Sequence, residues 1–389
     1  MAKWLEKTLG EVTAFIAKGI PPKYTEEENE NTIRVLNQKC NRNFEISYNE
    51  SRIHDCEKKK VPVDKMLRAG DVLINSTGTG TAGRVAQLVE VTVPTTIDGH
   101  MILMRPSEEL DPIYYGYAVK SFQSQIAGLA EGSTGQTEIN RRRLQDEVII
   151  RYPSDKLVQK NIGSFLANID EKIKTNKEIN KNLEQQAQAI FKSWFIDFEP
   201  FSNRKPSEWS VSTLGNVSIM GAGGDKPQNV SPIKTDLYEY PIYSNGLSNE
   251  GLYGFTDKPK ISEESVTVSA RGTIGFVCLR HIPYVPIVRL VTLIPKTEII
   301  SAKYLYLWLK QLHITGTGTT QQQLTVPDFQ KTEILVPSQE IVTLFTATVE
   351  PIFEKIWFNQ NENEKLSSLR DTLLPKLMTG ELDISGINI

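Results

Sequence analysis

A long segment between Ser154 and Ile196 constrains the fold of this chain more than any other feature of its sequence. Two rows of residues recur there at every seventh position, and the rows are offset by four, as d and a positions are in a coiled coil. The rows are Ile162, Ile169, Asn176, Leu183 and Ile190, and Leu166, Ile173, Asn180, Ala187 and Trp194. Such a helix would be about 60 Å long and would require a partner along its seam. An ordinary amphipathic helix on a globular core is the alternative.

A second segment with the same kind of pattern follows Pro337 and supplies that partner. Its two rows are Val342, Val349, Ile356 and Asn363, and Phe345, Ile352, Asn359, Leu366 and Leu373. An antiparallel pair of helices would bring Asn176 to Asn363 and Asn180 to Asn359. A buried Asn layer costs stability but fixes the register of the helices. Pro351 predicts a kink or a local opening in the second helix.

Length and composition favour two domains in addition to the helices. The chain has 389 residues, of which 39% are hydrophobic and 23% are charged, as in a soluble globular protein. No apolar stretch approaches the length of a membrane span, and the first residues lack the apolar core of a signal peptide. The three cysteines have no CxxC spacing. They indicate reduced thiols in a cytoplasmic protein that binds no metal.

Bulk charge does not identify a partner. The formal net charge is −3, and the most basic region, residues 201–336, has 13 basic and 11 acidic residues. Binding to nucleic acid would therefore depend on local clusters of side chains rather than on the overall charge.

The chain contains a long internal repeat. Trp4, Thr8-Leu9-Gly10 and Val12 near the start are matched at the same spacing by Trp209, Thr213-Leu214-Gly215 and Val217. In each copy, strand-like runs and a shorter helical segment precede one long helix, which predicts mixed α/β or α+β globules in a pseudo-twofold arrangement. The predicted domains are residues 1–152 and 201–337, and the predicted helical regions are residues 153–200 and 338–389.

No active site is evident in the sequence. The four histidines are scattered and form no HExxH or comparable metal-binding spacing. The glycines at positions 78, 80 and 83 have the spacing of a dinucleotide motif, but a strand-like run follows where that motif requires a helix. The sequence from Asp55 to Lys59 mimics the carboxylate-lysine cluster of metal nucleases, but it lies in a charged run and a solvated loop is the better explanation. The sequence therefore predicts no catalytic residues and no metal site.

Polar, glycine-rich loops occupy matching places in the two copies. Arg and Gln side chains pair with guanine and adenine edges, and Ser and Thr suit phosphates, so these loops are candidates for contact with DNA. Taken singly, each residue is more readily explained as solvated surface, and it is the occurrence at matching places in both copies that favours contact with DNA. The candidates are Asn75, Ser76, Thr77, Thr79, Arg84, Gln136, Thr137, Arg141 and Arg142 in the first copy, and Ser244, Asn245, Ser269, Arg271, Thr273, Gln321 and Gln322 in the second.

Several motifs give the chain, over essentially its whole length, a resemblance to the specificity subunit of type I restriction-modification systems. They are the repeated Trp-x-x-x-Thr-Leu-Gly-x-Val, Tyr240-Pro241-Ile242-Tyr243 with Asn245-Gly246, the run from Arg271 to Gly275, the run from Ile190 to Pro200, and the run from Leu374 to Glu381. The first half lacks a clear Tyr-Pro-x-Tyr segment.

The resemblance implies a non-catalytic DNA-reading subunit. Each globule would be a target recognition domain that reads one half of a bipartite sequence in double-stranded DNA. The antiparallel coiled coil would set the spacer between the half-sites and would dock two methyltransferase subunits. Phe191, Trp194, Phe195, Leu374 and Leu377 lie in the motifs expected at that interface. S-adenosylmethionine would be bound by the methyltransferase subunits, not by this chain, and motor-nuclease subunits could join the complex. The alternatives are a coiled-coil adaptor and a self-sufficient DNA-modifying enzyme.

Overall fold

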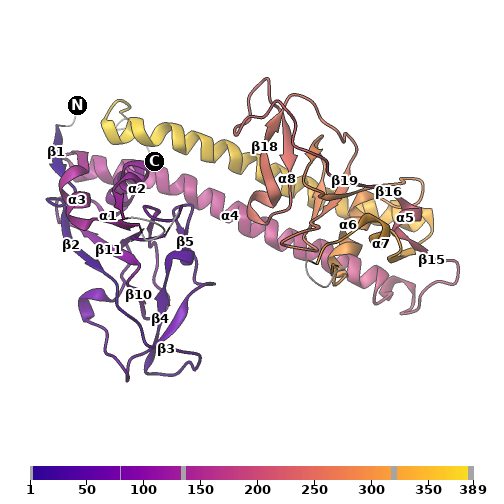
Figure 1. Cartoon of the computed structure of the whole chain (residues 1–389), viewed down its shortest axis with the longest axis horizontal. Helices are drawn as coiled ribbons and strands as arrows, with labels where there is room; N and C mark the ends of the chain where they lie inside the picture. The colour runs from indigo at the N-terminus through magenta and orange to yellow at the C-terminus, as the bar shows by residue number, and fades with distance from the viewer. Residues whose placement is uncertain (1–2, 79, 133–136, 317–321, 384–389) are drawn as a thin grey trace. The chain divides into compact units, whose positions relative to one another are not determined.

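The computed structural model describes residues 3–78, 80–132, 137–316 and 322–383. The chain divides into two compact units (Figure 1). Unit 1 comprises Met1–Asn176 and Asn361–Ile389, and unit 2 comprises Lys177–Gln360. Two long helices, α4 (Lys156–Phe195) and α8 (Gln339–Thr379), occupy the segments that contain the heptad rows. The boundary between the units falls within both helices, so each unit combines a mixed α/β globular part with a portion of each helix.

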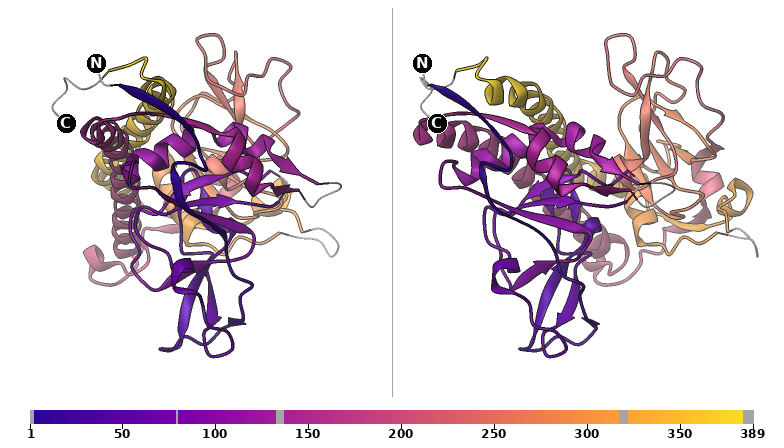
Figure 2. Two further views of the ribbon diagram at one scale, coloured as in Figure 1. Left: turned by 90° about the vertical axis from the view of Figure 1, so that its left-hand side faces the viewer. Right: turned by 60° about the vertical axis from the view of Figure 1, so that its left-hand side comes forward.

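Two four-stranded sheets form the globular part of unit 1. The sequence predicts buried strands at residues 72–74 and 101–104. These runs lie in β8 (Val72–Asn75) and β11 (Met101–Pro106), which are neighbours in the first sheet, and their apolar side chains are buried on both faces of that sheet. The second sheet lies on the opposite side of the first from the short helices (Figures 1 and 2). The first sheet has the order β2 (Thr13–Lys18), β11 (Met101–Pro106), β8 (Val72–Asn75), β9 (Val85–Gln87), and the second has the order β10 (Thr95–Ile97), β4 (Thr32–Leu36), β7 (Arg52–Asp55), β3 (Tyr24–Thr25). The smaller pairs are β1 (Trp4–Thr8) with β14 (Ile149–Pro153), β5 (Asn41–Arg42) with β6 (Glu45–Ile46), and β12 (Ala130–Glu131) with β13 (Glu138–Ile139).

Short helices cover the first sheet of unit 1. They are α1 (Pro112–Ser121) and α2 (Gln123–Gly128). The helix α3 (Arg141–Glu147) packs against β1 instead, and single turns occur at η1 (Gln38–Cys40) and η2 (Val63–Lys65). Asp111 caps α1 by accepting hydrogen bonds from the N–H groups of Ile113 and Tyr114. The sequence predicts one helix from Tyr114 to Ile126. The structure instead has two, because the helical path is broken at Phe122.

Unit 2 repeats this architecture in a shorter form. Its first sheet has the order β16 (Ser218–Ala222), β22 (Val291–Pro295), β19 (Ser265–Val268), β20 (Val277–Arg280), and its second has the order β18 (Leu252–Thr256), β17 (Tyr240–Tyr243), β21 (Val285–Pro286). The remaining elements are β15 (Ser210–Thr213) paired with β23 (Glu333–Val336), helices α5 (Leu214–Val217), α6 (Ala302–Gln311) and α7 (Val326–Phe329), and turns η3 (Glu199–Phe201) and η4 (Ser248–Gly251).

The two units correspond strand by strand. The first sheet has the same order and the same antiparallel pairing in both, so β8 corresponds to β19 and β11 to β22. In the second sheet, β4 pairs in parallel with β10, as β17 does with β21. The strand β4 therefore occupies the place of the Tyr-Pro-x-Tyr segment, for which the sequence of the first half shows no counterpart.

A separate hydrophobic core fills each unit, and both long helices contribute to each core. In unit 1, Ile162 and Leu166 of α4 and Leu377 of α8 pack with the buried residues of α1. In unit 2, Phe195 of α4 lies with its ring centroid 4.9 Å from that of Phe345 in α8. Full burial of such a side chain contributes about 1.5–3 kcal/mol, so these residues anchor the helices to the globular parts. Among the helices of the described residues, none is long and apolar enough to span a membrane.

Within each unit, α4 and α8 are antiparallel. In unit 1, Asn176 donates from Nδ2 to Oδ1 of Asn363 over 2.9 Å, and Asp170 pairs with Arg370 one to two turns further along. In unit 2, Asn359 donates to Asn180 over 2.8 Å. These are the two Asn pairs that the sequence predicts.

The helix α8 remains a single helix through Pro351, where the sequence predicts a kink or a local opening. The missing N–H of a proline removes one helical hydrogen bond. Phe353 and Ile356, just beyond it, are buried in the core of unit 2 and hold this part of the helix in place.

Candidate nucleic-acid interface

In unit 1, two polar segments that are distant in sequence lie side by side. The first is the β8–β9 loop, of which residues 76–78 and 80–84 are described, and the second is the segment before α3, residues 137–140. The N–H of Ile139 donates to the carbonyl of Ser76 over 2.8 Å, and Thr77 forms a bridge with Glu138. The two places at which the sequence predicts contact with DNA thus form one surface.

Unit 2 joins the corresponding segments in the same way. The β19–β20 loop, residues 269–276, lies beside the segment before α7, residues 322–325. The N–H of Leu324 donates to the carbonyl of Ala270 over 3.0 Å, and Nη2 of Arg271 donates to Oε1 of Gln323 over 2.9 Å. Each unit therefore presents a two-segment surface at an equivalent position.

Glycines let both loops turn sharply. Gly80 and Gly272 have φ angles of +72° and +69°, a region that favours glycine, and apart from their chain neighbours no heavy atom of the described residues lies within 4 Å of the position that a Cβ would occupy. The backbone around these glycines is therefore open on that side, which leaves room for the close approach of a ligand.

Several of the predicted contact residues are accessible. Arg141, Arg142, Arg271 and Gln322 are exposed, and the partly buried residues are Thr77, Arg84, Thr137, Ser244, Asn245 and Thr273. The hydroxyl of Thr273 is itself buried and has no hydrogen-bond partner in the part of the chain that the structure describes. Thr79, Gln136 and Gln321 lie outside the described residues.

The prediction that Asn75, Ser76 and Ser269 contact DNA through their side chains is corrected by the structure. All three side chains are buried within the chain, with exposures of 0%, 0% and 1%. They lie where β8 and β19 leave the first sheet, and both faces of that sheet are covered. Nδ2 of Asn75 donates to the carbonyl of Gln38 over 3.1 Å, so this side chain supports the loop from inside.

The basic residues of α3 differ in how closely neighbouring carboxylates compensate their charge. The Arg142 side chain is 91% exposed and lies 3.6 Å from Asp146. Arg143 is bound between Glu131 and Glu147, and its hydrogen bonds lower the pKa of both carboxyl groups. Arg142 is therefore the better candidate for an electrostatic contact.

The side chains that hold the β8–β9 loop were not identified from the sequence. Gln38 donates from Nε2 to the carbonyl of Thr77 over 2.6 Å, and Nδ1 of His100 lies 3.1 Å from the Thr77 hydroxyl. The equivalence of β4 with β17 would have been the signal for Gln38, but it is visible only in the fold.

The residues predicted to contact methyltransferase subunits are mostly internal. Phe191 and Phe195 are buried in the core of unit 2, and Leu374 and Leu377 are buried in the core of unit 1; Trp194 is partly buried. The prediction that these four buried residues contact methyltransferase subunits is corrected by the structure. Their apolar side chains instead attach the long helices to the globular parts.

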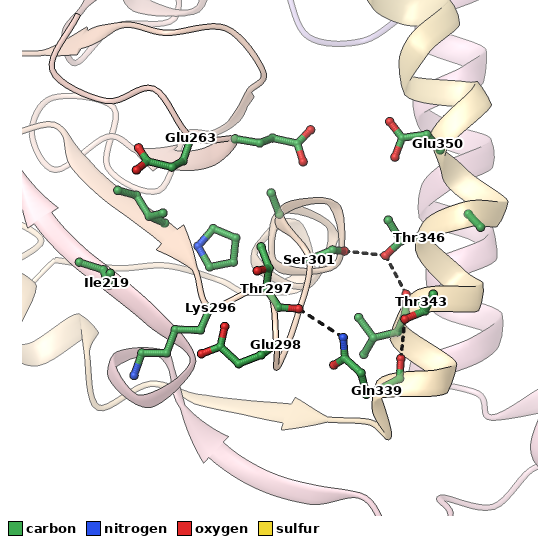
Figure 3. Close-up of a pocket in the computed structure, with 16 residues that line it drawn as sticks. Ile219, Glu263, Lys296, Thr297, Glu298, Ser301, Gln339, Thr343, Thr346 and Glu350 are labelled. Carbon is green, nitrogen blue, oxygen red and sulfur yellow. Dashed lines mark hydrogen bonds between the residues drawn. The ribbon is translucent and has the colours of Figure 1, made fainter.

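A cavity in unit 2 differs from the two-segment surfaces because several carboxylates line it. It has a volume of about 800 Å³ and lies among the end of β22, the start of α6 and the first turns of α8 (Figure 3). Glu263, Glu264, Glu298 and Glu350 line it, and the buried Lys303 is bound to Glu264 and Glu350 at 2.8 and 3.0 Å. These carboxylates disfavour an approaching phosphate. Among the described residues, no group of three or more His, Cys, Asp or Glu side chains is arranged to hold a metal ion.

Comparison with known proteins identifies the family. The family model described as the type I restriction modification DNA specificity domain matches residues 1–185 and 206–368. The chain is 28% identical over 313 residues to the type I restriction enzyme MjaIX specificity subunit of Methanocaldococcus jannaschii, covering 71% of this chain and 69% of that protein. It is also 28% identical over 312 residues to the HindI specificity subunit of Haemophilus influenzae, covering 59% of this chain and 68% of that protein.

A solved structure supports the fold independently. The type I restriction-modification S subunit from M. genitalium aligns with a TM-score of 0.58 over 97% of this chain and 96% of that one, at 19% sequence identity. The two domain matches coincide with the two halves of the repeat. The chain belongs to the family of type I restriction-modification specificity subunits.

Proposed function

We propose that this chain is the DNA-recognition subunit of a type I restriction-modification complex, and that each unit reads one half of a bipartite target in double-stranded DNA. One observation carries the proposal. In both units, a loop of the first sheet is hydrogen-bonded to the segment before a short helix, at Ser76–Ile139 and at Ala270–Leu324. Two equivalent polar surfaces in one chain suit a target that consists of two separate parts.

The residues best placed to read that target are the accessible ones on these surfaces. Arg271 and Gln322 in unit 2, and Arg141 and Arg142 in unit 1, have exposed side chains that can reach phosphates or base edges. The partly buried Thr77, Arg84, Thr137 and Ser244 can contribute backbone and side-chain groups, and Thr273 can contribute its backbone, because its hydroxyl is buried.

The proposal assigns the chemistry to other subunits. Two methyltransferase subunits would bind S-adenosylmethionine and transfer the methyl group, motor-nuclease subunits could join them, and this chain would be non-catalytic. The domain matches to specificity domains, and relatives that are named specificity subunits, support this division. The complex would act on DNA in the cytoplasm.

The long helices would pair as an antiparallel coiled coil that docks the methyltransferases and sets the spacer between the half-sites. The Asn176–Asn363 and Asn180–Asn359 hydrogen bonds support such a pairing, because each joins the predicted seam positions.

Co-purification with the co-encoded methyltransferase, followed by mapping of methylated adenines, tests the function. The complex should methylate one two-part sequence, and the chain alone should transfer no methyl group. Methyl transfer that increases with the concentration of the isolated chain would instead support the self-sufficient enzyme. A complex whose methylation pattern is unaffected by substitutions in both loops would support the adaptor.

A further inference from the structure

Gln38 and Asn245 occupy equivalent positions in the two units. Each lies two residues beyond the end of a strand in the second sheet, Gln38 after β4 and Asn245 after β17. The carbonyl of Leu36, the last residue of β4, accepts a hydrogen bond from the N–H of Asp98 over 3.0 Å. The carbonyl of Tyr243, the last residue of β17, accepts one from the N–H of Ile287 over 2.9 Å. Gln38 and Asn245 therefore occupy equivalent backbone positions in the two units, although the sequences around them show no similarity that would align them.

In unit 2, both polar atoms of the Asn245 side chain are used to hold the β19–β20 loop. Oδ1 accepts a hydrogen bond from the N–H of Ala270 over 2.7 Å. Nδ2 donates to the carbonyl of Val288, in the turn that precedes β22, also over 2.7 Å. The side chain thus links the loop to the turn. Its Oδ1 and Nδ2 atoms both form hydrogen bonds within the chain and so are less available to a base.

In unit 1, the Gln38 side chain links the corresponding loop and turn. Nε2 donates to the carbonyl of Thr77 over 2.6 Å, and it lies 3.4 Å from the carbonyl of His100, in the turn before β11. The main-chain carbonyl of Gln38 accepts from Asn75. The chemistry is inverted relative to unit 2: the loop group that Gln38 holds is an acceptor, whereas the loop group that Asn245 holds is a donor.

We infer that Gln38 and Asn245 are positioning residues for DNA recognition, each holding the backbone of the loop through which its own unit reads a half-site. The inference rests on the proposed function and assigns Asn245 a different role from the direct DNA contact predicted from sequence. Without this hydrogen bond the loop samples more conformations. Each binding event then includes the entropic cost of ordering the loop. Selectivity for the correct half-site should fall, because misplaced contacts discriminate poorly between bases.

Hydrogen exchange of the DNA-free full chain tests the geometric part. Asn245→Ala should accelerate exchange in peptides that cover residues 269–276 by about three- to tenfold, as expected for one lost hydrogen bond. Gln38→Ala should do the same for residues 76–84. Gln322→Ala serves as the matched control, because it removes an exposed side chain of the same surface and should leave exchange in both loops unchanged.

The acidic variants should distinguish the two side chains. Asn245→Asp keeps an oxygen that can accept from the Ala270 N–H, although its second oxygen then faces the Val288 carbonyl. It should therefore retain more protection of residues 269–276 than Asn245→Ala does. Gln38→Glu replaces the donor with an acceptor facing the Thr77 carbonyl and should lose protection as Gln38→Ala does. A general effect on packing or stability would change both acidic variants alike.

Methylation by the complex with the methyltransferase partner tests the functional part. Asn245→Ala should reduce selectivity at the half-site read by unit 2 by about tenfold, comparable to the loss of one base contact, and should leave the other half-site unchanged. Gln38→Ala should affect the opposite half-site. Asn245→Asp, compared by the ratio of correct to incorrect sites rather than by total activity, should recover much of the selectivity.

Three results would overturn the inference. The first is unchanged exchange in both alanine variants, which would show that the side chains hold nothing. The second is faster exchange with unaltered selectivity, which would confine them to local structure. The third is a loss of selectivity in Asn245→Ala without any change of exchange, which would support direct contact with DNA. Failure of the proposed function is distinguishable, because the unsubstituted complex would then read no two-part target.

Discussion

Nδ2 of Asn359 in α8 donates a hydrogen bond of 2.8 Å to Oδ1 of Asn180 in α4, and Nδ2 of Asn180 donates to the carbonyl of Ile356 over 3.1 Å. Asn359 is 1% exposed, and its own Oδ1 is buried with no hydrogen-bond partner within the described part of the chain. The pair is therefore joined by one side-chain hydrogen bond, but it also buries Oδ1 of Asn359. The cost of removing that oxygen from water is not offset by a hydrogen bond from the described residues. An apolar pair at this position would avoid that cost.

This arrangement predicts opposite effects for single and double replacement. Asn359→Leu alone should lower the free energy of unfolding by about 1–2 kcal/mol, because Asn180 loses its donor while remaining partly buried. Replacement of both Asn180 and Asn359 by leucine should raise the melting temperature by a few degrees. Replacement of all four Asn residues should also loosen the register. Calorimetry measures the first two effects, and disulfide cross-linking between α4 and α8 measures the third. A double variant less stable than both single variants would contradict the argument.

The seam shows which part of the fold could be predicted from sequence. Heptad rows place Asn180 and Asn359 on facing positions because a helix repeats its faces at a fixed interval. The repeat likewise predicts two similar globules, and the apolar runs of β8, β11, β19 and β22 predict buried strands. Local periodicity and repetition are sufficient for these elements.

The candidate site could be predicted only in part. The polar loops are visible in sequence, but Asn75 and Ser269 are buried because their strands are covered on both faces, which depends on the tertiary fold. Phe191 and Leu377 are large apolar residues of the kind found at interfaces. They are core residues here, again because of the tertiary fold. Gln38 could not be found because its role depends on the equivalence of β4 and β17.

A buried lysine in unit 1 predicts a pH dependence of stability. Among the described residues, Nζ of Lys120 has no hydrogen-bond partner; it lies 3.8 Å from Asp170 and 4.1 Å from the centroid of the Phe44 ring. Burial lowers the pKa of Lys120 from 10.5 to about 8. Between these two values the unfolded chain binds more protons than the folded chain, so the contribution of Lys120 to stability improves as the pH rises from about 8 to about 10.5.

Lys120→Met should remove this dependence. Near neutral pH the variant should be more stable than the unsubstituted chain by about 3 kcal/mol, and the difference should shrink as the pH approaches the pKa of Lys120 in the unfolded chain. Lys160→Met, at an exposed position of α4, is the matched control and should show no such trend. Calorimetry at about pH 7 and about pH 9.5 decides the question. A Lys120→Met variant that is less stable at both pH values would show that the contacts with Phe44 and Asp170 outweigh burial.

Exchange of residues 201–336 for the same region of a related specificity subunit should change one half of the DNA target and leave the other unchanged. The expectation follows from the separate core and the separate two-segment surface of each unit. Methylome sequencing of cells that express the chimera with its methyltransferase measures both halves at once. Alteration of both half-sites would show that the units do not read independently.

Arg271→Ala should weaken binding to the half-site read by unit 2. If the guanidinium reads a base, the loss should be about 1–3 kcal/mol and should depend on the sequence of that half-site; if it holds a phosphate, the loss should be nearly uniform across sequences and should reduce the salt dependence. Arg142→Ala provides the comparison in unit 1, where the side chain is 91% exposed. Binding titrations at several salt concentrations separate the two roles. Unchanged binding to every sequence would remove Arg271 as a contact.

Insertion of seven residues into each long helix should lengthen the spacer between the half-sites. The insertions belong after Asn176 in α4 and after Gln360 in α8, where one unit ends and the other begins. A heptad returns each seam to the same face, so the hydrogen-bonded Asn pairs on either side can be retained. The added length is about 10 Å, which corresponds to roughly three base pairs of duplex DNA.

The same insertion would also rotate one half-site around the duplex, and the proposed methyltransferase subunits would have to follow it. We therefore expect a variant that still assembles to methylate the same two half-sites with a spacer longer by about three base pairs. Insertion of seven residues into α4 alone is the control, because it shifts one helix against the other and should disrupt the Asn180–Asn359 pairing or abolish assembly. Methylome sequencing reads the spacer directly. An unchanged spacer in an active variant with both insertions would mean that a part of the complex other than these helices sets the distance.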